Sequence, residues 1–106
     1  MLEKDIEKIF TAEIKRAGGK AYKFTSPGND GVPDRIVMLP EGRIVFVELK
    51  TDTGKLSKLQ ELQCRRIAEL GQTVRVLHGL SGVRDFFLEF RLETAAYRLE
   101  RRLGRR

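Results

Sequence analysis

The stretch RIVFVELK at residues 43–50 constrains the fold more than any other part of the chain. Side chains in a strand alternate between two faces, and through the middle of this stretch both faces are largely apolar, which predicts a central β-strand. One face then ends in Glu48 and Lys50. A carboxylate and an ammonium beside a core require charged partners or a metal ion. We therefore expect the strand to end at a cleft, although a solvated ion pair at a strand end fits the same pattern.

Periodicity and turn residues predict the elements around this strand. In chain order they are a helix at 2–17, strands at 20–24 and 35–39, a turn at 40–42, the strand at 43–50, a helix from Ser57 to about Leu70, a strand at 73–77 and one last helix over most of 83–103. Ser57 and Gln60 match a capping box at the start of the second helix. The order predicts a single α/β domain with a small mixed sheet.

Composition limits the kind of site that this domain can hold. The chain has 106 residues with one cysteine and one histidine, so a zinc site built from these residue types is not expected. Oxygen ligands favour Mg²⁺, with Mn²⁺ as a substitute. The net charge of +6 suits a polyanionic partner. No apolar run is long enough to cross a bilayer, so we expect a cytoplasmic protein without a membrane partner.

Asp34 adds a second carboxylate to the predicted cleft. The short turn at 40–42 folds the strand 35–39 back along 43–50, so Asp34 and Glu48 are expected to converge with Lys50. Two adjacent carboxylates repel unless a cation lies between them. We expect both acids and the main-chain carbonyl of Leu49 to hold a metal ion. Lys50 would position or deprotonate a water, or stabilise the anion that forms during phosphodiester hydrolysis. A turn-forming aspartate after Pro33 is the simpler interpretation of Asp34.

The segments GVPDR at 31–35, ELK at 48–50 and GKLSKLQ at 54–60 resemble the PD-(D/E)xK nuclease superfamily, and within it the VRR-NUC (virus-type replication-repair nuclease) family. The resemblance runs from about Glu3 to about His78. It implies a restriction-endonuclease-like fold with an αβββαβ core, a nuclease domain over residues 1–80, and a bacterial or phage-encoded protein.

The resemblance also implies roles for individual residues. By this resemblance, Asp34 and Glu48 are expected to be metal ligands, and Lys50 is expected to be the catalytic lysine. A glutamine of the second helix is expected to face the site. An acid of the first helix is expected to join it. The glutamine is Gln60, with Gln63 as the alternative. The acid is Glu3, with Glu7 as the alternative.

Two further features concern the substrate and the assembly. Lys23, Lys55 and Lys58 are expected to contact DNA. The region 81–106 is expected to form a helix with a basic tail, where it would mediate dimerisation and contact DNA. The expected last helix has two apolar stripes, which suggests that one of them meets a second copy of the chain. A helix that is wedged inside its own monomer is the alternative. The stripes are Val83, Phe86, Phe87, Phe90 and Tyr97, and Leu88, Leu92, Leu99 and Leu103.

These features together predict a Mg²⁺-dependent, structure-selective DNA endonuclease. Two active sites in a homodimer suit paired cuts in a four-way (Holliday) junction, and larger relatives act in DNA repair. A non-catalytic nucleic-acid-binding domain is one alternative, in which the three charged residues form a structural ion network. A restriction-type endonuclease acting on duplex DNA is the other. The short chain leaves little room for an element that reads bases, which disfavours it.

Overall fold

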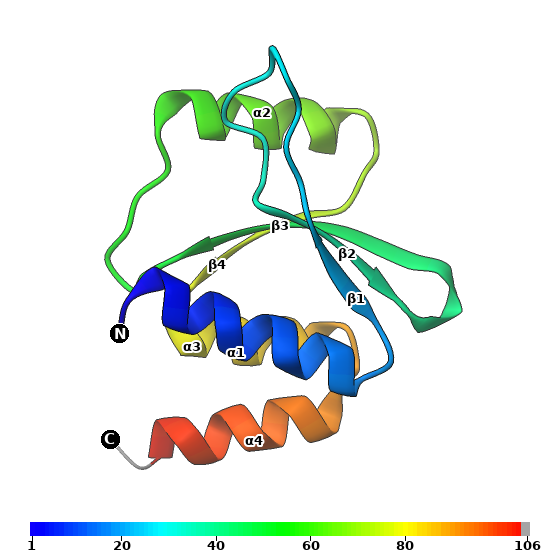
Figure 1. The fold of residues 1–106 in the computed structure, drawn as a ribbon, viewed down its shortest axis with the longest axis vertical. Helices are drawn as coiled ribbons and strands as arrows, with labels where there is room; N and C mark the ends of the chain where they lie inside the picture. Colours follow the sequence, from blue (N-terminus) through cyan, green and yellow to red (C-terminus); the bar gives the residue numbers. More distant parts are fainter. Residues whose placement is uncertain (105–106) are drawn as a thin grey trace.

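A computed structural model describes residues 1–104 of the chain. Its elements are α1 (Glu3–Arg16), β1 (Lys20–Lys23), β2 (Arg35–Leu39), a short 3-10 turn (Pro40–Gly42), β3 (Arg43–Lys50), α2 (Lys58–Glu69), β4 (Val74–His78), α3 (Gly79–Glu89) and α4 (Glu93–Gly104) (Figure 1). The predicted α/β fold with an αβββαβ order is confirmed as far as β4.

The four strands form one mixed sheet in the order β1-β2-β3-β4. β1, β2 and β3 are antiparallel neighbours, whereas β4 pairs parallel with β3 after the chain has crossed over through α2. In the β2–β3 register, Arg35 lies opposite Val47. β3 is therefore a central strand, as its apolar middle predicts.

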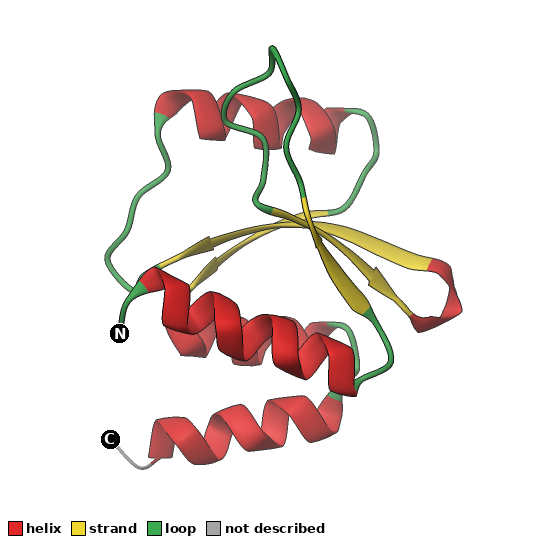
Figure 2. Ribbon diagram, viewed as in Figure 1, coloured by secondary structure: helices red, strands yellow, loops and turns green. Residues whose placement is uncertain are grey.

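The helices form layers on the two faces of the sheet (Figure 2). α2 covers one face, α1 and α3 cover the other, and α4 lies beneath α1 and α3. The main core lies between the sheet and α1 and α3, where Phe10, Phe86 and Phe87 are fully buried and pack against one another. Ile6, Phe10 and Ile14 are spaced one helical turn apart, so α1 presents a single apolar stripe to this core.

The prediction of one last helix is wrong, because α3 and α4 are separate helices. α3 ends in a Schellman motif, in which Leu92 N–H donates to Phe87 O at 2.7 Å and Arg91 N–H donates to Leu88 O at 3.2 Å. Arg91 occupies the left-handed position with φ 61°. Glycine usually takes this position. Because an arginine stands here instead, the sequence carries no glycine to mark the end of α3.

Because of this break, the two apolar stripes no longer indicate a second copy of the chain. The stripes are parts of two helices that both pack on the core of one chain: Phe86 and Phe87 are buried from α3, and Leu99 is buried from α4. Leu88 and Tyr97 are the largely exposed members. A shared core explains the pattern without a second copy.

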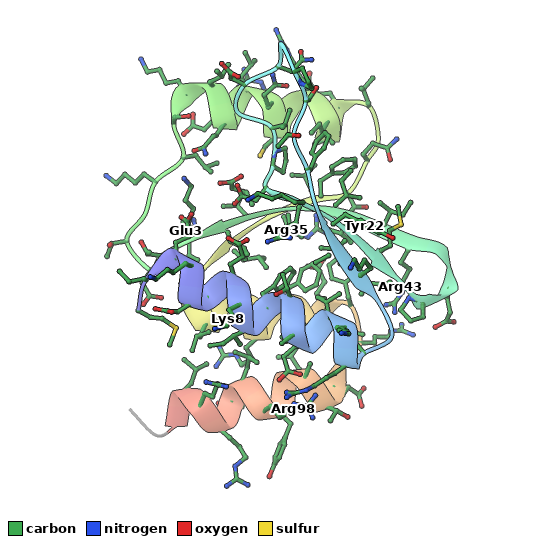
Figure 3. All side chains as sticks on the ribbon, viewed as in Figure 1. Glu3, Lys8, Tyr22, Arg35, Arg43 and Arg98 are labelled. Atoms are coloured by element: carbon green, nitrogen blue, oxygen red, sulfur yellow. The ribbon has the colours of Figure 1, made fainter. Side chains whose placement is uncertain are left out.

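An ion pair with a buried carboxylate attaches α4 to α1. Glu13 is 3% exposed and accepts hydrogen bonds from the Arg98 guanidinium at 2.6–3.0 Å, and from Arg16 at 3.2 Å. Figure 3 shows Arg98 reaching from α4 towards α1. None of the helices within residues 1–104 is long and apolar enough to span a membrane.

Candidate functional site

Asp34 and Glu48 meet where β2 begins and β3 ends. Asp34 directly precedes β2, and the register places it beside Glu48 of β3. Asp34 N–H donates to Glu48 Oε1 at 3.2 Å, and Leu49 N–H donates to Asp34 Oδ2 at 3.3 Å. Each carboxylate is thus held by main chain from the neighbouring strand. The two acids converge as the short turn between β2 and β3 predicts.

Glu48 is buried, with a relative exposure of 2%. Burial is the main cause that raises the pKa of Glu48 to about 7, and the nearby charge of Asp34 raises it further. The Lys50 ammonium, whose Nζ lies 3.7 Å from Glu48 Oε2, opposes part of this rise. The charged form of Glu48 is therefore costly in the protein alone, and a cation beside the two carboxylates would favour it.

Lys50 lies on the same face of β3 as Glu48. Its side chain is 15% exposed, so the ammonium lies at the edge of the site, within reach of solvent. In the parallel register Lys50 lies beside His78 of β4, whose Nδ1 is 3.3 Å from Thr51 O. His78 therefore contacts the loop that follows β3.

Gln60 both caps α2 and contacts the site. Ser57 N–H donates to Gln60 Oε1 at 2.9 Å, and Gln60 N–H donates to Ser57 Oγ at 3.1 Å, so the predicted capping box is present. The other end of the same amide donates from Nε2 to Glu48 Oε2 at 3.3 Å. Gln63 donates instead to the main-chain oxygen of Asp30 at 3.3 Å. Of the two glutamines, Gln60 is the one that lies against the acids.

The loop before Asp34 packs closely against the start of α2. Gly31 has φ +88°, and a Cβ there would lie 2.9 Å from the backbone carbon of Leu59. Pro33, two residues later, is buried. Gly31 is thus required both for its positive φ and because a side chain would collide with α2. The close packing of this loop on α2 sets the path of the backbone that leads to Asp34.

The two candidate acids of α1 are not hydrogen-bonded to Asp34 or Glu48. Glu3 is exposed in the first turn, where Figure 3 labels it. Glu7 pairs with Arg35, whose guanidinium also donates to Ala21 O at 3.2 Å. The sequence interpretation missed this role of Arg35. The signal was its position on the same strand face as the buried Val37 and Leu39.

The donors present fit a hard divalent cation. Residues 1–104 contain no group of three or more His, Cys, Asp or Glu side chains arranged to hold a metal, so two carboxylates must be supplemented by main-chain oxygen and water. Leu49 can supply such an oxygen: its N–H points towards Asp34, and in a strand the C=O of a residue points to the same side. β2 begins at Arg35 opposite Val47, so Leu49 lies beyond the paired region. Mg²⁺ is commonly bound in this way.

The three lysines predicted to contact DNA are all exposed. Lys23 lies opposite Arg35 in the β1–β2 register, so it shares the α1 face of the sheet with that arginine. Lys58 is the first residue of α2, and Lys55 lies in the loop before it. Lys55 and Lys58 are therefore on the α2 side of the sheet, where Gln60 bonds to Glu48, whereas Lys23 is on the opposite face.

Comparison with known proteins relates the chain to one family. The family model of the VRR-NUC domain matches residues 2–81. A protein of Acyrthosiphon pisum secondary endosymbiont phage 1, named "Putative nuclease p44", is 48% identical over 75 residues, which cover 71% of this chain and 81% of the phage protein. A solved structure described as a VRR_NUC domain has a TM-score of 0.75 at 31% identity, and the match covers 82% of this chain and 94% of that one. The chain therefore belongs to the VRR-NUC family, and nuclease is the activity that this membership supports.

Proposed function

We propose that the chain is a metal-dependent DNA endonuclease that hydrolyses phosphodiester bonds at Asp34, Glu48 and Lys50. The observation that carries the proposal is the pairing of two carboxylates, one of them buried, with an ammonium within 4 Å and an amide from α2. Two carboxylates placed side by side repel each other and lower the stability of the fold, so a stabilising role does not explain the arrangement.

Each residue has a distinct task in this proposal. Asp34, Glu48 and the Leu49 carbonyl hold the cation, which supplies positive charge to the scissile phosphate and acidifies a bound water when present. Lys50 orients the attacking water or stabilises the negative charge that grows on the phosphate. Gln60 keeps the Glu48 carboxylate in place by hydrogen bonding. Glu3, exposed in the first turn of α1, is kept as the proposed further acid because Glu7 is already paired with Arg35.

The preferred substrate in this proposal is branched DNA, with a four-way junction as the first choice. One chain offers one such site within its described residues, and resolving a junction requires two matched cuts. A homodimer related by two-fold symmetry would supply the second site. Sedimentation velocity at micromolar concentration tests the assembly, and a monomer under cleavage conditions would contradict paired cutting.

A cleavage panel tests the activity. Labelled duplex, flap, splayed-arm and four-way substrates are incubated with the protein in Mg²⁺, in Mn²⁺ and in EDTA. We expect cutting with either metal, none in EDTA, and a preference for the branched substrates. Asp34→Asn and Lys50→Ala should each lower the rate by roughly a hundredfold or more.

The matched control is Asp30→Asn, which removes an exposed carboxylate from the same loop as Asp34. It should cut at the parent rate. If Asp34→Asn and Lys50→Ala also cut at the parent rate, the site assignment is wrong. Binding of DNA without any cutting would favour the non-catalytic domain, and equal cutting of junction and unbranched duplex would favour a restriction-type enzyme.

A further inference from the structure

Two adjoining hollows lie along α1, outside the group of residues assigned to hydrolysis. One, of about 500 Å³, is lined by Lys4, Asp5, Glu7, Lys8, Thr11 and Arg35. The other, of about 390 Å³, shares Lys8, Thr11 and Arg35 and continues to Lys15 and the start of β1. Because they share three residues, we treat them as one feature, the α1 groove. Figure 3 shows Lys8 on α1 and Arg35 between that helix and the sheet.

The α1 groove is cationic. Its lining contains five lysine or arginine residues and two carboxylates, a net of +3. Lys4, Lys8 and Lys15, with Thr11 between them, follow the spacing of one helix face, and all three lysines are exposed. Lys20 also lines the groove, but its ammonium lies over the Tyr22 ring, 5.5 Å from the centroid.

The nearby acids do not neutralise this row of lysines. Within residues 1–104, none of the three has a carboxylate partner within ion-pair distance, and Glu7 and Glu13 are paired with arginines instead. Like charges one turn apart repel one another and weaken a helix. The face is also too polar to insert into a membrane surface, since Ala12 and Ala21 are the only apolar residues, among those described, that line the groove. A row of unneutralised ammonium groups fits a partner with regularly spaced negative charge.

The α1 groove also adjoins the candidate active site. Arg35 forms part of its floor and directly follows Asp34 in the chain. From Lys4 to Lys15 the helix rises about 16 Å, which equals roughly five nucleotide steps at 3.4 Å per strand. Arg35 points to the α1 face of the sheet, whereas Glu48 bonds to Gln60 of α2 on the other face. A nucleic-acid strand can therefore reach the groove from the site by passing round the end of the sheet where Asp34 precedes Arg35.

We propose that the α1 groove binds the phosphate backbone of a DNA arm next to the cleaved bond, through Lys4, Lys8 and Lys15. This proposal rests on the nuclease function above and adds a binding surface on α1 to it. The lysines position the arm by charge and read no bases. They therefore affect substrate affinity far more than the rate of the chemical step.

The test compares two double variants of the full chain. Lys8→Ala, Lys15→Ala removes two charges from the α1 groove, whereas Arg65→Ala, Arg66→Ala removes two exposed charges from α2. Alanine favours helix, so both variants should fold. We expect the α1 variant to raise KM on branched DNA by about tenfold or more with kcat within about twofold, and to reduce the slope of log binding constant against log salt by about 2. The α2 variant should change neither.

Binding in Ca²⁺ separates this proposal from the proposed hydrolysis. If the parent binds DNA in Ca²⁺ but does not cut it in Mg²⁺ or Mn²⁺, the hydrolysis proposal fails, and weaker binding by the α1 variant still supports the groove. If the α1 variant binds and cuts like the parent, or if the parent binds no DNA, the groove proposal is overturned. A photoreactive residue at Thr11 adds an independent measurement, and crosslinks should fall within about five nucleotides of the cut.

Discussion

At the scale of single residues, Glu48 is the most informative group in the molecule. It is buried, bonded to Gln60 and to the main chain of Asp34, and its pKa is raised to about 7 by burial and by the charge of Asp34. A proton and a metal ion compete for the same carboxylate. The ionisation state of Glu48 therefore links folding stability, metal affinity and the pH dependence of any reaction at this site.

The sign of this linkage gives a prediction for the metal-free protein. The pKa of Glu48 is 4.5 in its ordinary state and about 7 in the folded chain, so between these values the folded state binds more protons than the unfolded state. The free energy of unfolding should fall as pH rises through this window, by about 3 kcal/mol, and level off above it.

Urea denaturation in EDTA at pH 5 to 8 measures this change, with Glu48→Gln as the reference that cannot ionise. The difference in unfolding free energy between the two proteins isolates the contribution of Glu48. Parallel pH profiles would show that Glu48 titrates normally. Excess Mg²⁺ should flatten the profile of the parent if the ion binds the two carboxylates.

At the scale of elements, the break between α3 and α4 sets the shape of the C-terminal region. Arg91 adopts φ 61° at the position where helices usually place glycine. A side chain in this conformation costs free energy, because Cβ crowds the adjacent carbonyl.

Arg91→Gly should therefore stabilise the protein by about 0.5–1 kcal/mol, measured by thermal or urea denaturation. If residues 83–103 formed one continuous helix, the same substitution would destabilise it by about 1 kcal/mol. The direction of the change thus distinguishes the two arrangements. Arg102→Gly, inside α4, is the matched control and should destabilise the protein.

Sequence reasoning succeeded where a local rule determines the geometry. The short turn between β2 and β3 sets their register, and the register brings Asp34 beside Glu48. The capping box requires only Ser57 and Gln60, three residues apart. The contacts that it missed join distant segments: Glu13 with Arg98, and Glu7 with Arg35. Charged residues of α1 look equally solvated in the sequence, because nothing local shows which of them another element will cover.

At the scale of the whole molecule, the region after β4 belongs to the same core as the nuclease fold. Phe86 and Phe87 pack on Phe10 of α1, and Arg98 bonds to the buried Glu13. The family match ends at residue 81, yet α3 supplies much of the packing beneath the sheet. A boundary drawn after β4 would therefore divide the core.

Glu13→Ala should test how strongly α4 is attached. It removes a buried carboxylate that accepts hydrogen bonds from both Arg98 and Arg16, and we expect the free energy of unfolding to fall by more than it does when an exposed pair is broken. The matched control is Glu89→Ala, which breaks the solvent-exposed pair with Arg75 and should cost less than about 1 kcal/mol. Equal effects in urea denaturation would show that the α1–α4 pair contributes no more than an exposed one.

The two faces of the sheet differ in how firmly they are covered. The face beneath carries the three packed phenylalanines, whereas on the other face α2 contributes only Gln63 to the buried residues of the described chain. Glu48, Lys50 and Gln60 all belong to the sparsely covered side. Local opening there requires few apolar contacts to be lost, so α2 can shift to admit a bulky polyanion while the opposite layer keeps the chain folded.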